Sequence, residues 1–278
     1  MNWLLVDEKL KSALKEDIYF EDITTESIFK ENKKAKIDLI AKEDGIIAGL
    51  EVFKRVFLLI GDVHTNFYIN DGEKVTKDQK IGEIIGDIKT LLTGERVALN
   101  FLQRMSGIAT LTRQFTHKLK NTKTKLLDTR KTTPNLRVFE KYAVRIGGGF
   151  NHRLGLSDGI LIKDNHINAA GGIKSAVALI KNNAPFVRKI EVEVENLEQL
   201  KEAIDCKVDI IMLDNMSLTM LKKAVSIIDG KSITEASGNI TIDKIKDVAD
   251  CGVDYISTGA ITHSFKVLDL SIKKLTFL

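Results

Sequence analysis

The chain has 278 residues, of which 44% are apolar and 29% are charged, a composition that fits a globular protein and excludes a disordered or fibrous one. Its net charge of +4 is spread without long like-charge blocks, so the sequence predicts no nucleic-acid partner. The first residues form only a short apolar run before acidic residues follow, and no later run is long enough to span a bilayer. We therefore expect a cytoplasmic protein with no membrane partner.

The first hundred residues predict a separate α+β domain. A helical pattern over residues 9–17 is followed by short alternating runs over residues 35–53 and 67–87, with glycines where hairpins or strand ends are expected. A carrier hairpin with a modifiable lysine at its turn is an alternative interpretation, but a plain antiparallel sheet explains the same pattern. A long helix over residues 90–119 is expected to lead into the second half of the chain.

From about residue 100 onward, short apolar runs alternate with amphipathic helical patterns, which is typical of parallel βαβ units. Six such runs are clear, so the sequence predicts an incomplete α/β barrel of about six strands. Cys206 and Cys251 form no CxxC pair, and we expect two reduced core thiols.

Each of the six predicted strands ends in polar or glycine residues. In a parallel barrel the loops that follow the strands converge on one face, where substrates bind. The residues at these ends are Arg130, Lys131, Lys163, Glu193, Asp214, Ser237, Gly238 and Gly259. The sequence therefore predicts a binding site at this face.

Several of these residues are cations suited to an anionic ligand. Arg130 offers a fork of donors that matches a carboxylate, and Lys131 is a compact charge that suits a phosphate. His152 and Arg153 follow a glycine triplet, and a histidine near other cations is expected to be neutral and to donate one hydrogen bond to an anion. Lys163 ends a nearly all-apolar strand, where it either reaches the surface or pairs with an anion.

Acidic residues and small residues complete the expected site. Alternation places Glu191, Glu193 and Glu195 on one side of a strand, where inward-facing acids need a cation, a metal or sugar hydroxyls. Near a phosphate, such oxygen ligands suit magnesium. His166 has no zinc-type partners and is expected to have a capping or loop role. The loops at 235–239 and 257–264 are expected to hold a phosphate.

Taken in order, these motifs closely resemble the quinolinate phosphoribosyltransferase family of type II phosphoribosyltransferases, also called carboxylating nicotinate-nucleotide pyrophosphorylases. The resemblance covers nearly the whole chain and rests on DTRKTTP, GGG-x-NHR-x-GL, LIKDNH, EVEV, MLDN, EASG, STG, DITT, DGIIAGLEVF and GERVALNFLQRMSGIAT. It implies an N-terminal α/β sandwich over residues 1–105, which the C-terminal tail could complete, and a catalytic α/β barrel over residues 106–278.

The resemblance also implies the reaction and its partners. Quinolinate and phosphoribosyl pyrophosphate would give nicotinate mononucleotide, carbon dioxide and pyrophosphate, with Mg²⁺, for NAD biosynthesis. The protein is expected to be a homodimer in which each site is completed by the neighbouring subunit.

Residue roles follow from the same resemblance. Quinolinate would be bound by Arg130, His152, Arg153 and, from the partner subunit, Arg96. The catalytic residues, which also contact phosphoribosyl pyrophosphate, would be Lys131, Lys163, Glu193 and Asp214, the two acids holding magnesium and ribose hydroxyls. The 5′-phosphate would be held by Ser237, Gly238 and Gly259. Two residues depart from the usual pattern: Asn135 replaces a common glycine, and Phe150 replaces a common polar residue.

The expected chemistry is positioning and electrostatic stabilisation, with no covalent intermediate and no redox cofactor. Three alternatives compete with this hypothesis. A related molybdenum-transport paralogue shares the architecture, a phosphate-binding barrel lyase would explain the phosphate loops, and a non-enzymatic carrier would use the N-terminal hairpins. The intact dicarboxylate-binding motifs favour the transferase.

Overall fold

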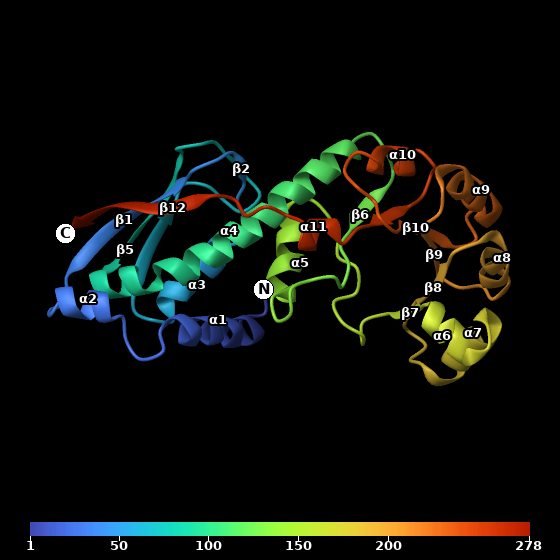
Figure 1. The fold of residues 1–278 in the computed structure, drawn as a ribbon, viewed down its shortest axis with the longest axis horizontal. Helices are drawn as coiled ribbons and strands as arrows, with labels where there is room; N and C mark the ends of the chain where they lie inside the picture. The colour runs from blue at the N-terminus through green and yellow to red at the C-terminus, as the bar shows by residue number, and fades with distance from the viewer. The chain divides into compact units, whose positions relative to one another are not determined.

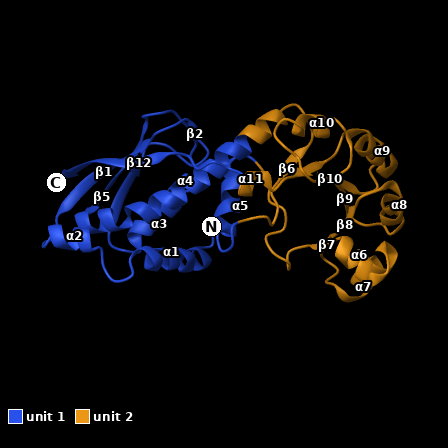
Figure 2. Cartoon of the chain, viewed as in Figure 1, with its two compact units in different colours: residues 1–113, 133–148, 264–278 blue, residues 114–132, 149–263 orange.

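The computed structural model describes residues 1–278, which form two compact units (Figure 2). Unit 1 consists of residues 1–113, 133–148 and 264–278, and unit 2 consists of residues 114–132 and 149–263. None of the helices combines the length and the apolarity that a membrane span requires.

Unit 1 is built around an antiparallel sheet with the strand order β12-β1-β5-β3. Its strands are β1 (Lys34–Ala41), β2 (Gly45–Ile46), β3 (Val63–Phe67), β4 (Lys74–Val75), β5 (Lys80–Asp87) and β12 (Leu270–Phe277). Its helices are α1 (Trp3–Asp17), α2 (Ile23–Ile28), α3 (Leu50–Leu58), most of α4 (Ile88–Lys118), and α5 (Arg137–Ile146). The expected antiparallel sheet and the expected long helix are both present.

Helix α3 shows how the local sequence builds this unit. The carboxylate of Asp71 accepts hydrogen bonds from the backbone N–H groups of Gly49 and Leu50, at 2.9 and 3.0 Å, and so caps the first turn. Phe53 and Phe57 lie one helical turn apart and are fully buried, with their ring centroids 5.2 Å apart. Full burial of each such ring stabilises the fold by about 1.5–3 kcal/mol.

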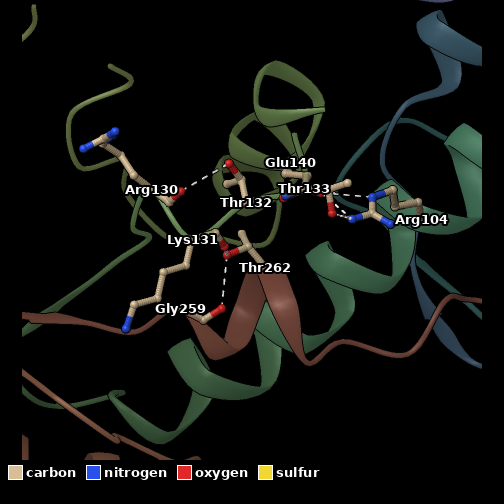
Figure 3. A network of polar contacts seen from close by, with 8 residues as sticks. All are labelled: Arg104, Arg130, Lys131, Thr132, Thr133, Glu140, Gly259 and Thr262. Carbon is tan, nitrogen blue, oxygen red and sulfur yellow. Dashed lines mark hydrogen bonds and ion pairs between the residues drawn. The ribbon is translucent and has the colours of Figure 1, made fainter. Parts of the chain in front are cut away.

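A buried ion pair lies between helices α4 and α5 of unit 1 (Figure 3). Glu140 is fully buried, and its Oε1 accepts a hydrogen bond from Nε of Arg104 at 3.0 Å. Its other oxygen accepts the backbone N–H of Thr133 at 3.2 Å, and Arg104 also donates to the Thr133 hydroxyl. Nearby, Asn135 has a φ of 66°, which agrees with the left-handed turn expected where a glycine is common.

Unit 2 is a parallel sheet with the order β6-β11-β10-β9-β8-β7. Its strands are β6 (Lys125–Leu127), β7 (Ile160–Ile162), β8 (Ile190–Val194), β9 (Ile210–Asp214), β10 (Ile233–Ser237) and β11 (Tyr255–Ser257). Its helices are α6 (Asp164–Ala170), α7 (Ile173–Asn183), α8 (Leu197–Asp205), α9 (Leu218–Ile228), α10 (Ile245–Ala249) and α11 (Ala260–His263). These are the six strands that the sequence predicted, in an α/β architecture.

The sheet does not close into a ring by strand pairing, because β6 and β7 form its two edges. The segment 149–153 extends the β6 edge: Phe150 forms a parallel bridge with Leu127, and the N–H of Asp128 donates to its carbonyl at 3.1 Å. Helices α8, α9 and α10 pack on the outer side of the curved sheet (Figure 1). The inner side of the sheet is therefore left for polar side chains.

Candidate active site

A cavity of about 450 Å³ lies at the carboxyl ends of the strands of unit 2. Of the eleven residues predicted for the site, nine line it: Arg130, Lys131, His152, Arg153, Lys163, Glu193, Asp214, Ser237 and Gly238. The structure thus brings together residues that are more than a hundred positions apart in the sequence. Convergence of loops at this end of a parallel barrel explains how it does so.

Acids and a lysine form one side of the cavity. Nζ of Lys163 lies 3.4 Å from Oε2 of Glu193, so this lysine pairs with an anion inside the cavity. Burial raises the pKa of Glu193, against the opposing charge of Lys163, and the negative charge of Asp214 raises it further. Two neighbouring carboxylates in one cavity form a site that a hard cation would stabilise. Glu193 and Asp214 therefore fit Mg²⁺ by the chemistry of their oxygen donors.

The loop after β10 has the backbone shape of an anion-binding turn. Gly238 has a φ of 95°, and a Cβ atom there would lie 2.3 Å from Oδ1 of Asn215, so only glycine fits. Asn239 also has a positive φ and donates from Nδ2 to Oδ1 of Asn215 at 3.1 Å, and Nδ2 of Asn215 donates to Asp214 at 2.6 Å. Asn215 thus links the predicted phosphate loop to the predicted magnesium ligand.

Gly259 does not line the cavity, but it makes room for a residue that does. A Cβ atom at Gly259 would lie 2.9 Å from Cδ of Lys131 and from Cδ2 of His263, so a larger residue would displace these side chains. The backbone of Lys131 is held from the same side, because the Thr262 hydroxyl donates to its carbonyl at 2.8 Å (Figure 3). Gly259 therefore leaves space for the side chain of Lys131, a role that the sequence alone did not suggest.

His152 is fixed by groups on both sides of its ring. Asp128 is fully buried and accepts the backbone N–H of His152 at 2.8 Å and Nδ2 of Asn151 at 2.6 Å. The backbone N–H of Arg153 donates to Nδ1 of His152 at 2.7 Å. Because Nδ1 accepts this hydrogen bond, the ring proton lies on Nε2.

The anion that Nε2 faces is part of the protein. Oε2 of Glu191 lies 3.1 Å from Nε2, and Oε2 of Glu235 lies 3.6 Å from it. Glu191 and Glu235 are 3% and 2% exposed, and Oε1 of Glu235 has no hydrogen-bond partner. Burial raises the pKa of Glu235 to about 7, and the charge of Glu191 acts in the same direction. The sequence predicted the inward-facing acids of β8, which include Glu191. It did not identify the inward-facing Glu235 of β10.

The remaining predicted residues have distinct surroundings. Arg153 donates to the carbonyl of Gly159 at 3.0 Å, and burial lowers its pKa, as does the charge of Arg130. His166 accepts the backbone N–H of Lys163 at its Nδ1, at 3.1 Å, which is the capping role expected from the sequence. Arg96 is exposed on α4 and belongs to unit 1.

The fold and this cavity define an α/β-barrel enzyme for anionic substrates. The family described as quinolinate phosphoribosyl transferase matches the chain in both parts: its N-terminal domain over residues 22–106 and its C-terminal domain over residues 108–273. The chain belongs to the quinolinate phosphoribosyltransferase family, as the motifs had indicated.

Relatives and solved structures agree with this membership. The probable nicotinate-nucleotide pyrophosphorylase [carboxylating] of Synechocystis is 44% identical over 98% of this chain and 93% of its own length. The protein of the same description from Bacillus subtilis is 44% identical over 98% and 94%. The crystal structure of NadC from Streptococcus pyogenes has a TM-score of 0.96 at 49% identity and covers 100% of this chain and 99% of its own. The nicotinate-nucleotide pyrophosphorylase of Francisella tularensis has a TM-score of 0.94 at 42% identity, over 99% and 98%.

Proposed function

We propose that this protein transfers a phosphoribosyl group from phosphoribosyl pyrophosphate to quinolinate and decarboxylates the product to nicotinate mononucleotide. The observation that carries the proposal is the single cavity lined by nine of the residues expected for this reaction. Cations and acids line the same cavity, which suits two anionic substrates and a sugar that becomes positively charged.

Quinolinate is placed beside the arginines of this cavity. Arg130 and Arg153 offer planar forks of donors for its two carboxylates. Burial lowers the pKa of Arg153, and a carboxylate bound next to its guanidinium would stabilise the charged form. His152 helps to fix the backbone of Arg153, because the backbone N–H of Arg153 donates to its ring.

Phosphoribosyl pyrophosphate is placed across the other strand ends. Ser237, Gly238 and Gly259 would hold the 5′-phosphate, and Lys131 and Lys163 would face the pyrophosphate. Glu193 and Asp214 would hold Mg²⁺ and the ribose hydroxyls. When Mg²⁺ is bound, it neutralises negative charge on the leaving pyrophosphate.

The first chemical step forms a bond between the quinolinate ring nitrogen and C1 of the ribose, while the bond from C1 to the pyrophosphate oxygen breaks. The pyrophosphate leaves with the electron pair, and C1 carries positive charge in the transition state. Glu193 and Asp214 would stabilise that charge, and Lys131 and Lys163 would stabilise the leaving group.

The second step breaks the bond between C2 of the ring and its carboxylate. Carbon dioxide leaves, the electron pair stays on C2 beside the cationic ring nitrogen, and a proton from solvent then neutralises C2. The protein has to orient the carboxylate and keep water from it, so no protein nucleophile is needed.

One assay tests the reaction. The purified protein is supplied with Mg²⁺, phosphoribosyl pyrophosphate and quinolinate labelled in its 2-carboxylate, and released carbon dioxide and nicotinate mononucleotide are measured. We expect both products from quinolinate and none from nicotinate. A folded protein that turns over neither compound would contradict the proposal and would indicate a different acidic substrate.

We also propose a homodimer in which Arg96 completes the site of the partner subunit. The support is that Arg96 is exposed on α4 while the family pattern places an arginine there for quinolinate. Arg96→Ala and Lys131→Ala proteins should each be inactive. After they are mixed, unfolded and refolded together, half of the dimers are mixed and each has one intact site, so about a quarter of the wild-type activity should return. Activity that never returns in demonstrably mixed dimers would exclude the shared site.

A further inference from the structure

Two buried glutamates share one histidine inside the barrel. Glu191 on β8 and Glu235 on β10, here called the buried acid pair, lie 3.1 and 3.6 Å from Nε2 of His152. Nδ1 of that ring already accepts the backbone N–H of Arg153, so the imidazole has only one proton to offer. That proton serves the nearer carboxylate, Glu191.

Glu235 is left with the side chain of Ser257 as a hydrogen-bond partner, and that bond reaches only one of its two oxygens. It is 2% exposed, and its Oε1 has no hydrogen-bond partner. Next to it in the sheet lie the apolar Met212 of β9 and Tyr255 of β11. An isolated carboxylate in such surroundings is strongly disfavoured, whereas a neutral carboxyl group is not.

Burial outweighs the two neighbours that lower the pKa of Glu235, which are His152 and the side chain of Ser257. The titratable and hydroxyl groups that line the two cavities beside it are Thr129, Arg130, Lys131, His152, Arg153, Asp158, Lys163, Lys189, Glu191, Glu193, Asp214, Ser237, Tyr255 and Ser257. Of these, Arg153 directs its guanidinium to the carbonyl of Gly159. The negative charges of Glu191 and Glu193 raise the pKa of Glu235 further.

The position of Glu235 connects its protonation to substrate binding. Glu235 lines the cavity that also holds Arg130, Arg153 and Lys131, and it lines a second cavity of about 290 Å³. A dicarboxylate bound by those cations would face the acid pair at short range. Each additional negative charge there opposes it.

We infer, on the basis of the proposed function, that Glu235 acts as an uncharged carboxylic acid in the quinolinate pocket, where its proton prevents a second carboxylate from opposing the substrate. Glu235 thereby sets the affinity for the dianion, and quinolinate binding is coupled to the uptake or retention of one proton. Phosphoribosyl pyrophosphate binds at the other strand ends and is not coupled in this way.

Proton uptake can be measured on the wild-type protein without any variant. Quinolinate is titrated calorimetrically at pH 7 in two buffers with different ionisation enthalpies. We expect proton uptake that increases as the titration is repeated at higher pH, because the pKa of Glu235 is raised to about 7 in the free site. Uptake that is zero within error would overturn the inference.

The kinetic test compares wild type with Glu235→Gln, which resembles the protonated acid at every pH. Between pH 7 and 8.5 the wild-type KM for quinolinate should rise about tenfold, and that of the variant should change less than about twofold. The KM for phosphoribosyl pyrophosphate should follow the same course in both proteins. Glu195→Gln removes an exposed acid that directly follows β8, the strand of Glu191, and should behave as wild type.

Other outcomes separate the inference from the proposed function. A protein that turns over quinolinate with the same pH dependence in wild type and Glu235→Gln would overturn the role of Glu235 alone. A folded protein with no turnover and no quinolinate binding would overturn the proposed function as well. The ligand atoms of His152, Glu191 and Glu235 lie within 4.8 Å of one another and could hold a metal ion. Stoichiometric metal that is bound by the wild type and lost in Glu235→Gln would therefore also overturn the inference.

Discussion

Two fully buried glutamates in this protein have opposite surroundings. Glu140 in unit 1 receives hydrogen bonds from the guanidinium of Arg104 and from the backbone N–H of Thr133. Glu235 in unit 2 has one oxygen without a partner and shares a single histidine with another acid. The difference teaches that burial alone does not decide what a carboxyl group does. A buried acid with matched donors holds structure, and one without them is suited to exchange a proton during function.

The largest effect should come from breaking the matched pair. Arg104→Ala leaves Glu140 buried without its cation, which should reduce the free energy of unfolding by about 3–5 kcal/mol. Denaturant melts at neutral pH would measure this. The double variant Arg104→Met, Glu140→Leu should recover most of the loss, since it buries no charge, and a double variant as unstable as Arg104→Ala would contradict the explanation.

A smaller effect, dependent on pH, should come from the unmatched acid. The pKa of Glu235 rises from 4.5 to about 7 on folding, so its protonated form is favoured in the folded state. Stability contributed by this group is therefore present below pH 4.5 and is lost as the pH rises to 7.

Glu235→Gln removes that dependence. Relative to wild type it should raise the free energy of unfolding by about 3 kcal/mol at pH 8.5 and by less than about 1 kcal/mol at pH 5. Urea melts at the two pH values would measure the difference. A gain of equal size at both would mean that Glu235 is not protonated in the folded protein.

The smallest effect should come from an ion pair on the surface. Lys246 and Asp250 form an i,i+4 pair at α10, with side chains 46% and 53% exposed. Lys246→Ala should change the free energy of unfolding by less than about 0.5 kcal/mol, and added salt should reduce even that. A loss comparable with that of Arg104→Ala would show that burial does not explain the ranking.

The sequence predicted the architecture of unit 2 because its signals are local. Each parallel strand is a short apolar run with a polar end, so six strands and the convergence of their ends could be expected. The positive φ of Asn135 and the capping role of His166 follow from the same kind of local signal.

What the sequence did not predict depends on contacts between distant strands. Glu191 was recognised as facing inward on β8, but Glu235 belongs to a motif that was interpreted only for its Ser237 and Gly238. Alternation along β10 places Glu235 and Ser237 on one side, and this signal could have found it. That Glu235 meets Glu191 across β9 follows only from the strand order. The space that Gly259 leaves for Lys131 also depends on packing.

The strand order of unit 1 has a consequence for synthesis of the protein. Strand β12 pairs along β1, although it follows β1 by the whole length of unit 2. During translation the edge of β1 therefore emerges long before its partner and remains an open template for pairing with other chains. Unit 2, whose strands all lie between residues 125 and 257, needs nothing from β12 for its own sheet. The sheet of unit 1 therefore lacks its last strand until the end of the chain has emerged from the ribosome.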